Sequence, residues 1–281
     1  MPSFLHDGHR LAYTELGDPD CPRTTVLLHG LLLSQKMHMP LARTLADRGN
    51  RVITIDLLGH GESDRPVDML SYSMSQWGEQ VIGLLDHLGT DQAVLVGTSL
   101  GANVALESAA LAPARLRGMV IEMPVLDNAL LACTIAFAPV MLATTFGLPV
   151  TRPITRALAA LPRWGLPFWG EVILDWVSQD PAPSGAVLRG LVFGRVAPPR
   201  SVRRRLETQA LVIGHRSDPV HAFSDADMLV DELPHGRLVE ASSIIELRLA
   251  PERLTREISG FIDECWRPRA AAPARRPAAS G

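Results

Sequence analysis

A serine between two glycines stands at the junction of a predicted strand and a predicted helix. Ser99 lies in the run Gly-Thr-Ser-Leu-Gly over residues 97–101. The apolar residues 93–96 before it predict a buried strand, and residues 102–110 after it predict a helix. This arrangement is typical of a nucleophile elbow, a sharp turn that projects the serine hydroxyl from the edge of a sheet. The glycines avoid collisions that β-carbons would make with the strand and helix. We therefore predict that Ser99 is a nucleophile.

Attack by a serine on a carbonyl carbon also requires donors for the developing oxyanion, a base, and a group that orients the base. The amide of Leu100 begins the predicted helix, where the positive end of the helix dipole lies, so we expect it to be one donor. The second donor in such sites comes from a loop after an earlier strand. Here that loop follows His29-Gly30 and points to the amide of Leu31. We expect His29 itself to fold the loop.

The elements that must position these groups alternate between short apolar strands and helices. Strands are predicted over residues 9–16, 24–28, 51–56, 93–96, 119–123, 209–214 and 237–241. Helices are predicted over residues 37–48, 74–88, 102–110, about 225–233 and 251–266. This alternation predicts an α/β fold whose mostly parallel, doubly wound sheet is covered by helices on both faces.

One segment interrupts the alternation. Residues 124–207 contain many prolines and tryptophans and predict no strand, so we interpret them as a helical cap. The cap is inserted into a core made of residues 1–123 and 208–266. Within it, residues 128–151 carry no charge and are long enough to span a bilayer. Their internal prolines and their place between two strands of one sheet favour an apolar lid instead.

Two further structural expectations concern segments that contain several arginines. Arg200 and the arginines at 203–205 predict a solvated face where the chain leaves the cap. The tail 267–281 repeats Ala, Pro and Arg, and it is predicted to be disordered because it carries too little apolar surface to order itself.

Composition indicates a well-packed globular protein, since 47% of the residues are hydrophobic and 20% are charged. The net charge of −3 gives no reason to expect nucleic acid or an anionic membrane as partner. Cys21, Cys133 and Cys265 are odd in number and widely spaced, which favours reduced thiols. The first seven residues lack the features of a signal peptide. We expect a cytoplasmic protein.

Four segments together carry a resemblance to a known family. They are His-Gly at 29–30, Asp56 with the Gly-His-Gly-Glu-Ser-Asp-Arg-Pro run that ends at 66, the elbow at 97–101, and Val-Ile-Gly-His-Arg-Ser-Asp-Pro-Val at 212–220. On these residues the chain, from about Phe4 to Trp266, resembles the α/β-hydrolase superfamily, of the capped type with a serine nucleophile. The resemblance implies that Asp218, after the penultimate strand, is the triad acid and that the His60 loop is structural. A serine at the elbow argues against haloalkane dehalogenases and epoxide hydrolases, which resemble this fold but use an aspartate there.

The position of the catalytic base in the sequence differs from the family pattern. The superfamily places its catalytic histidine after the last strand, just before a Pro-Glu that opens the final helix. Pro-Glu is present at 251–252, but residues 242–250 contain no histidine and none follows His235. His235 precedes the last strand and should lie on the rim opposite Ser99. His221 is a candidate base, because it alone keeps the order Ser, Asp, His on the correct rim; the alternative is a surface or pocket-lining residue.

Other assignments of the site stay open. His215, His38 and His60 are weaker candidates for the base, and Asp127 is an alternative acid. The protein could instead bind or rearrange a lipophilic ligand without acyl chemistry, or be an inactive binding module. The distinction matters because removal of the base from a serine triad costs on the order of a millionfold in turnover.

The cap predicts the class of ligand. Residues 129–150 are apolar, and Trp164, Phe168, Trp169 and Trp176 follow, so we expect an apolar lid over Ser99. Such a pocket suits a small lipophilic ester, lactone or thioester. Alternatively, these side chains pack the cap onto the core and leave little cavity. No Gly-rich phosphate loop and no metal-ligand spacing occurs, so we expect neither cofactor nor metal. The sequence does not indicate an oligomeric state.

Overall fold

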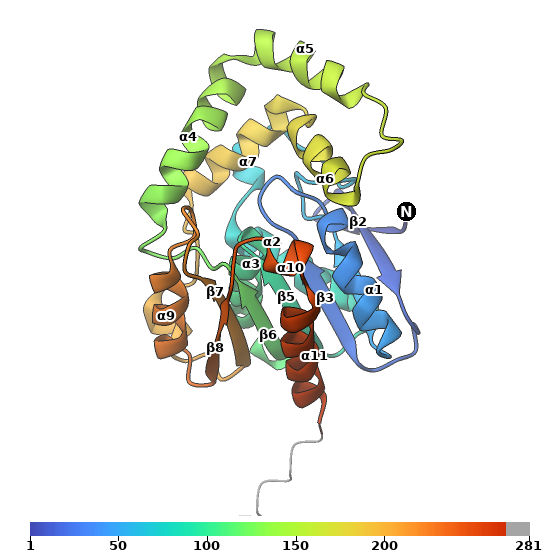
Figure 1. The fold of residues 1–281 in the computed structure, drawn as a ribbon, viewed down its shortest axis with the longest axis vertical. Coiled ribbons are helices and arrows are strands. Elements are labelled where there is room, and N and C mark those ends of the chain that lie inside the picture. Colours follow the sequence, from blue (N-terminus) through green and yellow to red (C-terminus); the bar gives the residue numbers. More distant parts are fainter. Residues whose placement is uncertain (268–281) are drawn as a thin grey trace, which may run out of the picture.

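A single sheet forms the centre of the molecule in the computed structural model, which describes residues 1–267 (Figure 1). Its eight strands in the described residues follow the order β1-β2-β4-β3-β5-β6-β7-β8. They are β1 (Ser3–His6), β2 (His9–Leu16), β3 (Thr24–Leu28), β4 (Arg51–Ile55), β5 (Ala93–Thr98), β6 (Leu116–Glu122), β7 (Gln209–His215) and β8 (Gly236–Ala241). The β1–β2 and β2–β4 pairs are antiparallel, and the remaining pairs are parallel. The predicted α/β fold with a mostly parallel sheet is therefore confirmed.

Helices cover both faces of the sheet. Alternate residues of each strand point to opposite faces, so apolar side chains on both faces need cover. The covering helices are α1 (Met39–Asp47), α2 (Met74–His87), α3 (Leu100–Leu111), α9 (Phe223–Glu232) and α11 (Glu252–Trp266). On β5, Leu95 belongs to the apolar cluster that contains residues of α2, α3 and α9. Its neighbours Val94 and Val96 belong to the cluster that contains residues of α1 and α11. Both faces of β5 are thus buried, which explains its uninterrupted apolar sequence.

Short elements refine the predicted boundaries. They are the 3₁₀ helices η1 (Gln35–His38), η2 (Met69–Ser71) and η3 (Pro113–Arg115) and the α-helical turn α10 (Glu246–Leu249). The helix predicted over 37–48 divides into η1 and α1, with Pro40 in the first turn of α1. The strand β1 was not predicted, because four residues with one buried side chain, Phe4, give no usable periodicity.

Five helices separate β6 from β7. They are α4 (Leu130–Phe146), α5 (Leu148–Ala159), α6 (Phe168–Val177), α7 (Pro181–Phe193) and α8 (Arg200–Arg203). The first four lie above the end of the sheet where the parallel strands terminate, and α5 lies farthest from the sheet (Figure 1). In residues 1–267 no single helix is long and apolar enough to cross a bilayer. Helices α4 and α5 meet that test only as a pair, and the pair is bent by 104°.

Two expectations about the arginine-rich segments have different outcomes. The prediction of a solvated face is wrong at Arg203, which is buried and donates to Glu232 of α9 at 2.5 Å. Its acidic partner lies in another element, so the local sequence gives no sign of the pair. Arg204 and Arg205 are exposed as expected. The predicted disorder of the tail concerns residues that, from 268 onward, lie outside the described part of the chain.

Candidate active site

The serine elbow has the strained geometry that its sequence predicts. Ser99 adopts φ +54° and ψ −113° between the end of β5 and the start of α3. Non-glycine residues rarely occupy positive φ, so the surrounding structure must hold this turn. A β-carbon on Gly97 would lie 2.1 Å from the carbonyl oxygen of Gly101, and one on Gly101 would lie 2.1 Å from that of Leu28. The two glycines are therefore required by the close approach of strand and helix.

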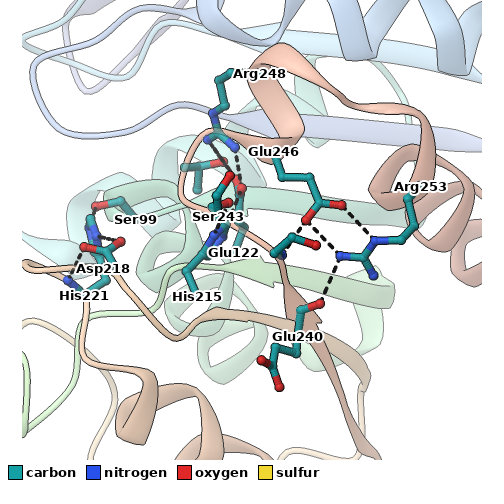
Figure 2. Close-up of polar contacts among 12 residues, drawn as sticks. Ser99, Glu122, His215, Asp218, His221, Glu240, Ser243, Glu246, Arg248 and Arg253 are labelled. Atoms are coloured by element: carbon teal, nitrogen blue, oxygen red, sulfur yellow. Dashed lines mark hydrogen bonds and ion pairs between the residues drawn. The ribbon is translucent and has the colours of Figure 1, made fainter.

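A histidine contacts the serine directly. His221 Nε2 lies 2.9 Å from Ser99 Oγ, and His221 Nδ1 lies 2.8 Å from Asp218 Oδ2 (Figure 2). Acid and imidazole come from the same loop, between β7 and α9, three residues apart. The structure thus brings together the three side chains Ser99, His221 and Asp218.

The loop fixes the imidazole through both oxygens of one carboxylate. Asp218 Oδ1 accepts the backbone N–H groups of Val220 and His221 at 2.8 and 2.9 Å, which leaves Oδ2 for the ring. Burial by itself would raise the pKa of Asp218, but the hydrogen bonds from the His221 ring and from these amides outweigh it. The pKa is lowered from its ordinary value. The carboxylate is therefore ionised at neutral pH and requires a proton on His221 Nδ1.

Both expected oxyanion donors lie beside the serine. Leu31 and Leu100 line the same cavity as Ser99. A β-carbon built on Gly30 would lie 3.9 Å from Ser99 Cβ, so the loop after β3 passes close to the elbow. Within residues 1–267 neither amide donates to another protein group.

The other histidines considered for the base bond elsewhere. His38 Nε2 lies 3.0 Å from Leu28 O, His60 Nδ1 lies 3.1 Å from Leu58 O, and His215 Nδ1 lies 2.9 Å from Ser243 O. His235 pairs with Glu207 beside a separate surface hollow. Burial lowers the pKa of His38 to about 4 and holds that of His60 well below its ordinary value.

His29 lies in the loop after β3, with Nδ1 2.9 Å from Gly30 O and Nε2 accepting the Leu57 amide. Asp127, the alternative acid, lines the cavity but is exposed.

A charge pair lies beside the elbow, and its arginine comes from the segment where the family's histidine is missing. Arg248 of α10 donates to both carboxylate oxygens of Glu122, the last residue of β6 (Figure 2). Glu122 also accepts from Thr98 Oγ1 at 2.6 Å, and its carbonyl accepts the Ser99 amide at 2.8 Å. Burial alone would raise the pKa of Glu122, but Arg248 and the hydrogen bonds lower it. The pair thus supports the turn that carries Ser99.

Sequence reasoning missed Glu122 and Arg248 as members of the site. The available signal was a carboxylate at the end of an otherwise apolar strand, since a buried acid requires a partner. Nothing in the sequence pointed to Arg248 as that partner, because the two residues are 126 positions apart.

An apolar cavity of about 630 Å³ adjoins Ser99 and His221. Helices α4 and α7 supply part of its apolar lining, through side chains such as Phe137, Met141 and Leu188. Its polar side chains include Asn103, Asp127, Thr134 and the arginines 195, 200 and 203. The helices between β6 and β7 therefore leave a chamber of ligand size instead of packing tightly against the elbow. No group of three or more His, Cys, Asp or Glu side chains in residues 1–267 is placed to hold a metal ion.

A mostly parallel sheet with a serine elbow at its centre defines the α/β-hydrolase fold. A family model described as "alpha/beta hydrolase fold" matches residues 25–146. The solved enol-lactonase from Burkholderia xenovorans LB400 superposes with a TM-score of 0.75 at 22% identity, covering 93% of this chain and 100% of that one. The chain therefore has the α/β-hydrolase fold.

Curated relatives match over shorter segments. A putative 2-succinyl-6-hydroxy-2,4-cyclohexadiene-1-carboxylate synthase of Bacillus subtilis is 34% identical over 42% of this chain and 42% of its own length. A 2-hydroxymuconate semialdehyde hydrolase of Pseudomonas putida is 46% identical over 25% of each chain. The match thus spans less than half the length of these relatives.

Proposed function

We propose that this chain is a serine hydrolase in which Ser99 is the nucleophile, His221 the base and Asp218 the acid. The observation that carries the proposal is the 2.9 Å contact between Ser99 Oγ and His221 Nε2, with Asp218 on the opposite ring nitrogen. In the neutral imidazole, a proton on Nδ1 facing the ionised carboxylate leaves Nε2 unprotonated and facing the hydroxyl. The imidazole is therefore ready to accept the proton of Ser99.

The proposed reaction follows from this proton placement. Ser99 Oγ bonds to the substrate carbonyl carbon as its proton passes to His221 Nε2, and the carbonyl π electrons move to oxygen. The amides of Leu31 and Leu100 donate to that oxygen. Collapse of the intermediate breaks the bond to the leaving group, which takes the proton from His221. Water, deprotonated by His221, then cleaves the acyl-enzyme and regenerates Ser99.

The cavity supports a lipophilic ester, lactone or thioester as substrate. Its lining is mainly apolar, and Ser99 lies at its wall. We interpret residues 124–207 as the cap that excludes water from this chamber. One relative is described as a 2-hydroxymuconate semialdehyde hydrolase, which is consistent with hydrolysis as the reaction.

Covalent labelling with a fluorophosphonate and burst release of p-nitrophenol from medium-chain esters test the proposal. Wild-type protein should label and give a burst, and Ser99→Ala should do neither. His221→Ala should lower turnover by on the order of 10⁴-fold or more, because no base remains. His235→Ala is the matched control and should keep full activity, since its ring lies at Glu207, away from the cavity.

Absence of labelling in folded wild-type protein would contradict the proposal and favour a ligand-binding or non-hydrolytic homologue. Labelling and turnover that are unchanged in His221→Ala would reject His221 as the base while leaving Ser99 as the nucleophile.

A further inference from the structure

Helix α4 is apolar on all sides, although only one side is covered. Its inner residues, such as Phe137 and Met141, line the cavity. On the opposite side Leu131, Ile135, Leu142 and Phe146 are exposed, Phe146 by 79%. A helix that is apolar all round is ordinarily buried in a core or in lipid. The outer side of α4 therefore lacks the cover that its composition calls for.

The exposed apolar surface continues beyond α4. Val150 and Ile154 of α5 are exposed, and Trp164 in the following loop is 86% exposed. We call these three residues, with Leu131, Ile135, Leu142 and Phe146 of α4, the outer cap face. Its α5 portion lies at the extremity of the molecule, farthest from the sheet (Figure 1). Large exposed apolar side chains concentrated on one part of the chain indicate an interaction site.

Charge identifies the kind of partner. Between Asp127 and Glu171 the sequence contains three arginines and no acidic residue. Arg163 pairs with Asp175 of α6, and Arg152 of α5 makes an exposed ion pair with Asp180 at 3.9 Å, whereas Arg156 of α5 is exposed without an ion pair among residues 1–267. Although the whole chain has a net charge of −3, this surface is basic. Exposed aromatic and aliphatic side chains beside arginines are the pattern of a helix that lies in a membrane interface.

We propose that the outer cap face docks on an anionic lipid surface, with α4 and α5 lying against the bilayer and not crossing it. Phe146, Ile154 and Trp164 would enter the boundary between headgroups and acyl chains, and Arg152 and Arg156 would bind lipid phosphates. A second copy of the chain fits less well. A two-fold interface brings the same patch of both subunits together, so the α5 arginines would face their own counterparts.

Docking in this way places the membrane one helix away from Ser99. The same helix, α4, supplies the exposed residues on its outer side and the cavity lining on its inner side. A lipophilic substrate could therefore pass from the bilayer to the cavity along α4 without crossing the core. Binding itself does not depend on the proposed hydrolase chemistry, so Ser99→Ala should bind lipid as well as wild type does.

Vesicle flotation tests the proposal. Full-length protein should float with phosphatidylcholine vesicles that contain about 30% phosphatidylglycerol, and it should bind pure phosphatidylcholine vesicles on the order of 30-fold more weakly. Salt should weaken the binding to anionic vesicles, because it screens the arginines. Failure to bind the anionic vesicles would overturn the proposal.

Matched variants separate docking from general effects. Arg152→Gln/Arg156→Gln should reduce partitioning on the order of 30-fold, and Phe146→Ser/Trp164→Ser should reduce it about 10-fold or more. The controls Arg43→Gln/Arg48→Gln and Leu5→Ser/Leu111→Ser alter exposed residues elsewhere and should leave partitioning unchanged. Equal losses in the controls would reject this face as the lipid site. Sedimentation that reveals a lipid-free dimer, dissociated by Phe146→Ser/Trp164→Ser, would assign the face to a second copy.

Discussion

At the scale of residues, Asp218 and His221 form a unit whose geometry is set within four consecutive positions. One carboxylate oxygen accepts two backbone amides of the loop, and the other accepts the ring N–H. The imidazole orientation therefore depends little on distant elements. One short loop thus holds both a carboxylate and an imidazole, the two groups that the α/β-hydrolase family usually takes from two separate segments.

The substitution Asp218→Asn tests the unit. The oxygen of the introduced carboxamide would still accept the loop amides, so the fold should be retained. Its NH₂ group donates, however, and would force His221 Nδ1 to accept, which puts the ring proton on Nε2 facing Ser99. We expect turnover to fall by about 10⁴-fold, measured as p-nitrophenyl ester hydrolysis beside thermal unfolding. A variant that unfolds normally and keeps more than about a tenth of the wild-type rate would remove Asp218 from the mechanism.

At the scale of elements, one side chain ties the elbow helix to both ends of the helical insertion. Asn103, buried in α3, donates to Val125 O before α4 and to Val196 O after α7, at 2.7 and 2.6 Å. It also accepts the Val125 amide at 3.1 Å. Near the first end, buried Asp225 of α9 accepts the amides of three residues that lead into α4: Leu126, Asn128 and Ala129. The insertion is thus anchored at both ends.

Loss of the Asn103 contacts should loosen the insertion. Asn103→Ala leaves three backbone groups without their partner, and we expect unfolding free energy to fall by about 2–4 kcal/mol. Proteolysis within residues 124–207 should also become faster than in wild type. Gln92→Ala, which removes an exposed side-chain bond to Ala114 O, is the control and should cost no more than about 0.5 kcal/mol. Equal protease resistance in wild type and Asn103→Ala would show that the anchor lies elsewhere.

At the scale of the whole molecule, a row of buried neutral histidines makes folding sensitive to mild acid. Burial lowers the pKa of His29, His38 and His60, with His38 at about 4. Between that value and an ordinary pKa of about 6.5, the unfolded chain binds protons that the folded chain does not. Stability is therefore full above about pH 6.5 and declines as the pH falls.

Denaturant unfolding at about pH 7.5 and about pH 5 measures this decline. His38 alone should lower the unfolding free energy by about 2 kcal/mol at the lower pH. Carboxylates with lowered pKa values, such as Glu122, act mainly below about pH 5 and contribute little to this difference. His38→Gln, whose amide can donate to Leu28 O in place of the ring, should show a decline smaller by that amount. His235→Gln is the exposed control. If the unfolding free energy of both variants falls between the two pH values as much as that of wild type, His38 is not a source of the acid sensitivity.

The sequence alone determined the fold class and the position of the serine elbow. Strand and helix periodicities are local, so they predicted the order of elements, and the spacing of Gly97, Ser99 and Gly101 predicted the strained turn. The loop order also brought Asp218 to the correct edge of the sheet, because the carboxyl ends of parallel strands meet there. His221 entered as one candidate among several for the same reason, since its position in the chain fixes the rim but not the direction of its ring.

Only the tertiary structure decided which imidazole contacts the serine, what lies in the segment without a histidine, and whether the insertion encloses a cavity. Each of these depends on side chains that are distant in the sequence: Arg248 meets Glu122 across 126 positions, and His221 meets Ser99 across 122. The exposed outer side of α4 is likewise invisible in an unbroken apolar run, because composition does not reveal which side of a helix the rest of the chain covers. Local patterns determine backbone geometry, whereas contacts between segments distant in the sequence form only when the chain folds.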